Sequence, residues 1–264
     1  MADARADAGL APATPVLSRR RAWRLVLAYD GTGFHGWQVQ PDAVTVQGAL
    51  LDAARRLFAD GEVRVVGASR TDAGVHAVGQ TVALSAEGDF PPATVQAALN
   101  AYLPREIRVV AAAEAPEGFD ARRAARGKRY LYLIDNGAVP SPLLLRWAWH
   151  VPGRLDLDAM RAALAALRGA HDFSAFCAAP GREVEPICCV RALHVRSRKS
   201  LVALAISADR FLHHMVRNVV GSAVEVARGA QPPAWMAAVL AGRDRTKAGP
   251  TAPAQGLTLV RVLY

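Results

Sequence analysis

Hydrophobic residues recur with two different periods along this chain, and segments of the two kinds alternate. Over residues 23–29 every second residue is large and apolar, which predicts a strand with one buried face. Over residues 45–59 the apolar residues recur at helical spacing behind a threonine suited to the N-cap, with Val46, Leu50 and Leu57 on one face. The same reading predicts strands on both sides of residues 67–77, then a helix and a strand. The first half therefore has the order β-α-β-β-α-β, which is the ferredoxin-like arrangement.

The second half of the chain gives a rough echo of this order. The pattern predicts the following elements: strands over 130–135 and 147–151, a helix over 158–167, a loop over 169–177, strands over 188–196 and 201–207, a helical run within 209–221, a short helix over 233–241 and a last strand over 257–263. We therefore expect an α+β protein of two ferredoxin-like (RRM-like) subdomains, residues 22–136 and 147–264, that share an extended, mainly antiparallel β-sheet flanked by helices. Residues 1–21 have no apolar signal-peptide core and are predicted to be a disordered basic tail.

The positive net charge of the chain suggests that this α+β protein has a polyanionic partner. There are 32 Lys and Arg against 23 Asp and Glu, a formal charge of +9, and only three of the cations are lysines. Arginine favours planar, bidentate contacts to phosphate, so a nucleic acid is a plausible partner. No apolar run is long enough to span a membrane.

The cysteines indicate a reducing compartment. Cys177, Cys188 and Cys189 are odd in number and form no Cys-x-x-Cys pair. This spacing argues against a disulfide framework and against a cysteine zinc site. We expect the protein in the cytoplasm.

Asp72 is the first candidate for chemistry, because it lies between two predicted strands among small residues that leave room for a ligand. Arg70 precedes it by two positions, and a nearby cation keeps a desolvated carboxylate ionised. This is a suitable setting for a nucleophilic or charge-stabilising aspartate. An ordinary Asx-turn with an arginine partner fits the same residues.

Two further segments carry candidate residues. The densest basic cluster, residues 122–129, precedes the aromatic strand 130–135, which suits phosphate contact beside base stacking, or else a solvated sheet edge. In the helical run, Arg217 needs an anionic partner if it is buried, either a local carboxylate or Asp72. On a helix the adjacent His213 and His214 would point in different directions, and so would not form a metal-binding pair.

Five of these segments resemble motifs of one family. Gly-Ala-Ser-Arg-Thr-Asp-Ala-Gly-Val-His-Ala (67–77) resembles the signature of the tRNA pseudouridine synthase A family. Four other segments resemble its further motifs, in order and over almost the whole chain: residues 29–40, 128–132, 171–176 and 211–218. The last strand departs from the pattern, because an aromatic residue is expected near Thr258.

The resemblance implies an isomerase that converts uridine to pseudouridine at positions 38 to 40 of the tRNA anticodon stem-loop, after flipping the base into a pocket. It implies a homodimer in which one tRNA contacts both subunits, with no metal or other cofactor. Asp72 would be the nucleophile or charge stabiliser, Arg217 its ion-pair partner, and Tyr130 the residue that stacks on uracil and relays a proton. Substrate contacts are expected from the following residues: Arg70, His76, Lys128, Arg129 and Tyr130.

Three points stay open at the level of sequence. Asp72 could attack C1′, attack C6 of uracil, or abstract a sugar proton. A non-catalytic RNA-binding module is one alternative, because ferredoxin-like sheets with arginines and aromatic residues often bind RNA without reacting with it. A hydrolase that uses Asp72 with His76 or His171 is the other alternative.

Overall fold

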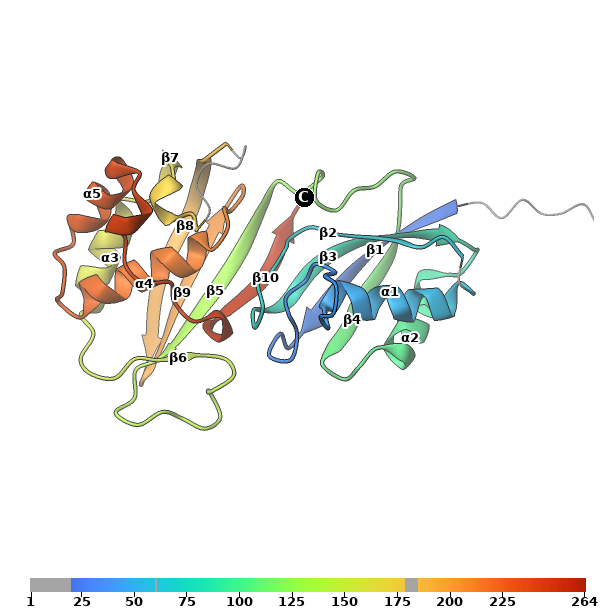
Figure 1. The fold of residues 1–264 in the computed structure, drawn as a ribbon, viewed down its shortest axis with the longest axis horizontal. Coiled ribbons are helices and arrows are strands. Elements are labelled where there is room, and N and C mark those ends of the chain that lie inside the picture. Colours follow the sequence, from blue (N-terminus) through green and yellow to red (C-terminus); the bar gives the residue numbers. More distant parts are fainter. Residues whose placement is uncertain (1–19, 60, 179–184) are drawn as a thin grey trace, which may run out of the picture.

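One ten-stranded sheet organises the molecule. The computed structural model describes residues 20–59, 61–178 and 185–264. The strand order is β4-β1-β3-β10-β5-β9-β8-β7, with β2 paired to β3 and β6 paired to β5 (Figure 1). The strands are β1 (Arg20–Tyr29), β2 (Arg64–Gly67), β3 (His76–Glu87), β4 (Ile107–Ala115), β5 (Gly127–Asp135), β6 (Trp149–His150), β7 (Gly169–Asp172), β8 (Ile187–Arg198), β9 (Leu201–Ala208) and β10 (Leu257–Leu263).

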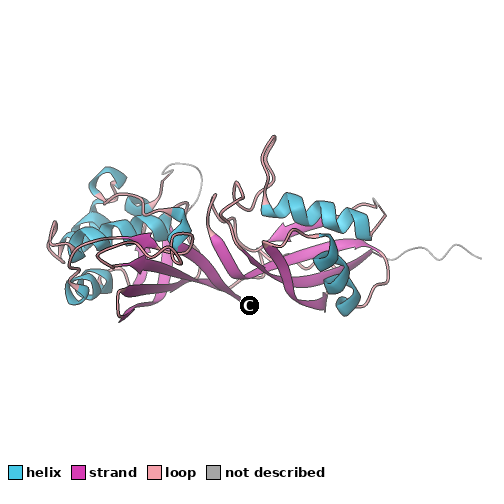
Figure 2. Ribbon diagram, turned by 90° about the horizontal axis from the view of Figure 1, so that it is seen from below, coloured by secondary structure: helices cyan, strands magenta, loops and turns pink. Residues whose placement is uncertain are grey.

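Within the described residues, five α-helices flank this sheet in two groups. They are α1 (Val46–Leu57), α2 (Pro92–Tyr102), α3 (Leu157–Ala165), α4 (Met215–Ala227) and α5 (Trp235–Gly242). The first two cover one end of the sheet and the other three cover the opposite end (Figures 1 and 2). Only the β10–β3 and β5–β6 pairs are parallel among the named strand pairs. The predicted α+β class with a mainly antiparallel sheet is confirmed, and no helix in the described part of the chain is long and apolar enough to cross a membrane.

The last strand of the chain joins the two halves of the sheet. β10 pairs in parallel with the start of β3, where Leu259 lies opposite Ala77, and antiparallel with β5, where Leu259 lies opposite Tyr130. The chain end therefore places the beginning of β3 two strands from Tyr130. The division into subdomains 22–136 and 147–264 stays a prediction.

The strongest periodic segments fold as predicted. Trp23, Leu25 and Leu27 of β1 are fully buried, and the Thr45 hydroxyl caps α1 by accepting a hydrogen bond from the Gly48 N–H. β1 begins at Arg20, so the last two residues of the predicted tail belong to the sheet, while residues 1–19 lie outside the described residues. Tyr102, the last residue of α2, is 46% exposed.

Two predicted elements are wrong. Residues 169–177 are not a loop throughout, because Gly169–Asp172 forms β7 against β8 and a short 3₁₀ helix follows over Ser174–Phe176. The helical run does not occupy residues 209–214. β9 continues to Ala208 to complete its pairing with β5, and α4 begins only after His214, whose φ of 59° is left-handed.

Gly221 sets how closely α4 packs against the segment before β10. A Cβ at this position would lie 1.7 Å from the Pro250 carbonyl oxygen, so only glycine fits. This close approach brings the Ala252 N–H within 3.1 Å of the Arg217 carbonyl oxygen. The segment that leads into β10 is therefore fixed to the first turns of α4.

We expect Gly221→Ala to lower the free energy of unfolding by about 1–3 kcal/mol, because the clash is with backbone that cannot rotate away. Gly242→Ala at the end of α5 is the matched control. Its Cβ would meet nothing within 4 Å, and loss of glycine flexibility should leave stability unchanged or raised by up to about 1 kcal/mol. Urea denaturation followed by circular dichroism measures both, and equal midpoints for the two variants would contradict the packing described.

Candidate active site

The loop that carries Asp72 is held from both sides. The buried Gln80 side chain accepts a hydrogen bond from the Ser69 N–H at 3.2 Å and donates one to the Ser69 carbonyl oxygen at 2.6 Å. The Thr71 hydroxyl bonds the Tyr29 hydroxyl at 2.8 Å, and the Thr71 carbonyl accepts from the Trp37 N–H at 3.0 Å. A loop with this many buried partners presents its aspartate in one orientation.

Asp72 forms an ion pair across the molecule. The Arg217 guanidinium donates a hydrogen bond to Asp72 Oδ2 at 2.9 Å and, through Nε, another to the Ala252 carbonyl oxygen at 2.8 Å. The side chains of Asp72 and Arg217 are 24% and 15% exposed, so the pair is partly shielded from water. The sequence left two possible partners for Arg217, a local carboxylate or Asp72, and in the structure its partner is Asp72.

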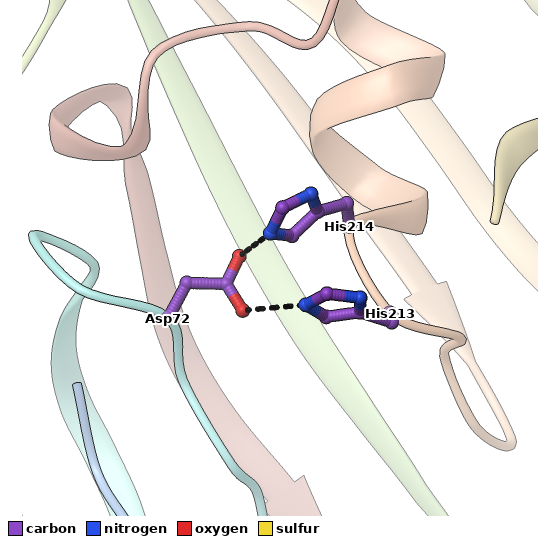
Figure 3. A group of neighbouring side chains, drawn as sticks. All are labelled: Asp72, His213 and His214. Atoms are coloured by element: carbon purple, nitrogen blue, oxygen red, sulfur yellow. Dashed lines mark ion pairs between the residues drawn. The ribbon is translucent and has the colours of Figure 1, made fainter. Parts of the chain in front are cut away.

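Two histidines that sequence reasoning did not connect to Asp72 also face it. His214 Nε2 lies 3.3 Å from Asp72 Oδ2, and His213 Nε2 lies 3.9 Å from Oδ1 (Figure 3). The rings lie side by side, with centroids 3.9 Å apart. The expectation that they point in different directions is wrong, because it assumed a helix and His214 instead has a left-handed backbone. Burial lowers the pKa of His214 below its usual value, although the Asp72 carboxylate acts in the opposite sense.

Tyr130 closes the site from β5. Its hydroxyl lies 2.7 Å from the Ser69 hydroxyl, and its ring meets Phe211 edge-on at 5.1 Å. Burial raises the pKa of Tyr130 to about 12, and the negative charge of Asp72 acts in the same direction. The phenol is therefore protonated at neutral pH and can donate a hydrogen bond.

These residues line one cavity of about 620 Å³, a size that suits a small organic ligand. Its walls include Ser69, Arg70, Asp72, Lys128, Tyr130 and Arg217, from the β2–β3 loop, β5 and α4. Lys128 and Tyr130 share one face of β5 because side chains alternate along a strand. Burial lowers the pKa of Lys128 to about 8, and the Arg122 guanidinium acts in the same direction.

Two of the predicted substrate-contacting residues lie elsewhere. His76 is 2% exposed, accepts a hydrogen bond from the Gly31 N–H and donates one to the Gln255 carbonyl oxygen. Both ring nitrogens are thus occupied, and His76 fastens the start of β3 to two loops instead of facing the cavity. Arg129 alternates to the other face of β5 and is exposed there. Of the residues expected to touch substrate, the structure brings Arg70, Lys128 and Tyr130 to Asp72, and does not bring His76 or Arg129.

The histidines of the hydrolase alternative are not placed to assist Asp72. Neither His76 nor His171 is among the residues that line the cavity in the described part of the chain. The ring of His171 donates instead to the Arg168 carbonyl oxygen at 2.7 Å. The sequence did contain one indication of the histidines that face Asp72. His213 and His214 come shortly before Arg217, the residue predicted to pair with that carboxylate.

The family model and the curated relatives give the same result. A family model described as tRNA pseudouridine synthase matches residues 25–122 and 163–264. The tRNA pseudouridine synthase A of Myxococcus xanthus is 44% identical over 242 residues, which cover 91% of each chain. That of Methylobacterium sp. (strain 4-46) is 46% identical over 243 residues, covering 92% of this chain and 97% of the other. A crystal structure of the archaeal box H/ACA sRNP Nop10–Cbf5 complex aligns at 12% identity and a TM-score of 0.37, covering 90% of this chain and 48% of that one.

We expect Lys128 to titrate near pH 8 and to lose its positive charge as the pH rises through that value. The sequence has two other lysines, Lys199 and Lys247, both exposed, which act as internal references. Pulse acetylation at a series of pH values, read by mass spectrometry, gives a midpoint for each amine. A midpoint for Lys128 equal to those of the two references would contradict its desolvation in the cavity.

Proposed function

The chain belongs to the tRNA pseudouridine synthase family, and we propose that it isomerises uridine to pseudouridine at positions 38 to 40 of the tRNA anticodon stem-loop, with Asp72 as nucleophile. Pseudouridine synthases are isomerases, so the enzyme class follows from the family. The position in tRNA and the role of Asp72 are the parts that the proposal adds.

The observation that carries the role of Asp72 is its place in the cavity. It is a carboxylate on a clamped loop, oriented by Arg217 and next to a protonated phenol. A carboxylate repels phosphate, so it weakens the attraction of the surrounding cations for RNA. A reaction that needs a nucleophile explains why it is there.

The chemistry matches the residues present. The N1–C1′ bond breaks, the uracil turns, and C5 bonds to C1′; C5 loses its proton and N1 gains one, so the reaction has no redox step. Asp72 attacks the flipped nucleotide, and Arg217 holds the carboxylate in place. Tyr130 stacks on the uracil and relays the proton. Burial raises its pKa to about 12, so the phenol carries its proton at neutral pH and is available to donate it.

The charge around the cavity supports tRNA as substrate. The base is enclosed in a stem-loop, so it must be flipped out, and its flanking phosphates then lie at the cavity mouth. Arg70, Arg122 and Lys128 line the cavity and offer cations for those phosphates. Below pH 8 Lys128 is mostly charged and can contribute to this attraction.

The proposal includes a cytoplasmic homodimer that works without a cofactor. Support for a second subunit comes from the connection between β5 and β6, which exposes large apolar side chains. Val139, Leu143 and Leu145 are 76%, 83% and 56% exposed. Apolar side chains gathered on one loop are a suitable contact for another protein surface.

The first test is tritium release from tRNA transcripts that carry [5-³H]uridine, because pseudouridine formation expels the C5 hydrogen. We expect release by the wild type and none by Asp72→Asn, which keeps the shape of the side chain and removes its nucleophilic charge. Asp158→Asn is the matched control. It also removes an arginine partner, since Asp158 pairs with Arg161 at 2.6 Å, but its side chain is 94% exposed and is not among the residues that line the cavity.

Each other outcome has a definite meaning. Release by both wild type and Asp72→Asn would remove Asp72 from the chemistry. Bound tRNA without release by the wild type would favour a non-catalytic RNA-binding module. Free uracil in place of pseudouridine would favour a hydrolase.

We expect Tyr130→Phe to lower kcat by about 10²-fold, with KM little changed, because it keeps the ring and removes only the proton relay. Tyr132→Phe is its control on the same strand, since it removes a buried hydroxyl that donates to the Pro253 carbonyl oxygen at 2.7 Å outside the cavity. That loss should cost about 1 kcal/mol of stability and leave kcat near the wild-type value. Steady-state kinetics compare the two, and equal kcat values would show that the Tyr130 hydroxyl moves no proton.

A further inference from the structure

Three potential metal ligands converge at the mouth of the cavity. Asp72, His213 and His214 each offer one ligand atom, and these atoms all lie within 4.8 Å of one another. Figure 3 shows both imidazole rings directed at the same carboxylate, one toward each oxygen. Side-chain exposures of 55% for His213, 25% for His214 and 24% for Asp72 leave the cluster open to solvent.

We propose that this cluster binds one divalent transition-metal ion of the zinc type, and that the bound ion inhibits the enzyme. Two imidazoles and one carboxylate, with a remaining position open to water, form a ligand set that zinc commonly adopts. Zinc would be an inhibitor here and no part of the reaction. The inhibition rests on the proposed function, whereas the binding does not.

The distances favour this site. Ligand atoms about 2.0–2.1 Å from a tetrahedral zinc ion lie about 3.3 Å from one another. The separation between His214 Nε2 and Asp72 Oδ2 is already 3.3 Å, and that between His213 Nε2 and Asp72 Oδ1 is 3.9 Å. The two distances end on different oxygens of the carboxylate, and the three ligand atoms lie within 4.8 Å of one another, so closure around one ion takes a shift of the half-exposed His213 side chain.

The backbone explains why two adjacent histidines can act together. Neighbouring side chains on a regular helix point about 100° apart, which would separate the two rings. His214 precedes α4 with a φ of 59°, and this left-handed turn brings its ring beside that of His213. The pair is thus preorganised before any ion arrives.

Two positively charged features next to the cluster reduce its affinity for a cation. The Arg217 guanidinium is bonded to Asp72 Oδ2, and the positive end of the α4 dipole is close to His214. Both weaken cation binding, so we expect a labile ion that a chelator removes, and not a permanent structural zinc. Asp72 Oδ1 has no hydrogen-bond partner among the described residues and keeps its lone pairs for the ion.

The metal test uses the full, untagged chain, because a histidine tag would itself bind zinc. Isothermal titration with ZnCl₂ should show one ion per chain. His213→Ala and His214→Ala should each weaken binding by about tenfold or more, and His194→Ala, which removes an exposed histidine on β8, should not. Mg²⁺ should not compete, because imidazole ligands favour zinc over magnesium.

Contrary binding results are equally plain. No zinc binding to the wild type, or binding that neither His213→Ala nor His214→Ala weakens, would overturn the site. Loss of binding in Cys177→Ala alone would do the same, because that thiol also lines the cavity.

Activity separates this inference from the proposed function. Tritium release by the wild type should fall when zinc is added and recover fully with EDTA. Zinc that binds without lowering release would overturn the inhibition. A wild type that releases no tritium in metal-free buffer would instead overturn the proposed function, and the titration would still decide the metal site.

Discussion

The ion pair between Asp72 and Arg217 is the contact on which the site depends, because it joins two segments 145 residues apart. Asp72 comes from the loop between β2 and β3, and Arg217 from the first turn of α4. The guanidinium is also fixed to the Ala252 carbonyl oxygen, in the segment that leads into β10. Other contacts of the fold therefore hold both partners in place, and the ion pair keeps the carboxylate in one position.

Stability does not explain why such a pair is placed here. A partly buried ion pair loses hydration that its own attraction barely recovers, and apolar residues of the same size often stabilise a protein as much. The many hydrogen bonds around Ser69 and Thr71 fix the same loop without any charge. The charge is better explained by chemistry, because a nucleophilic carboxylate has to be ionised and held in one orientation.

Sequence alone predicted the features that depend on local periodicity. The alternation around Trp23 gave β1, Thr45 gave the start of α1, and the small residues around Asp72 marked the loop of the site. The sequence did not predict side-chain positions that depend on the backbone conformation of a single residue. His213 and His214 could not be placed without knowing that β9 continues to Ala208 and that His214 is left-handed. His76 lies in the same motif as Asp72, yet it is turned into the core as the first residue of β3, which motif spacing does not reveal.

Among the described residues, Asp72 Oδ1 accepts no hydrogen bond, and this bears on both proposals. The Arg217 guanidinium donates to Oδ2, whereas His213 Nε2 lies 3.9 Å from Oδ1, beyond hydrogen-bond distance. A nucleophile needs such an oxygen, since a carboxylate bonded at both oxygens is oriented but less reactive. The lone pairs of that oxygen, facing two imidazoles, are what a transition metal requires. The proposed reactivity toward a nucleotide and the proposed sensitivity to zinc would therefore both depend on the same feature, an ion pair with Arg217 that uses one oxygen of Asp72.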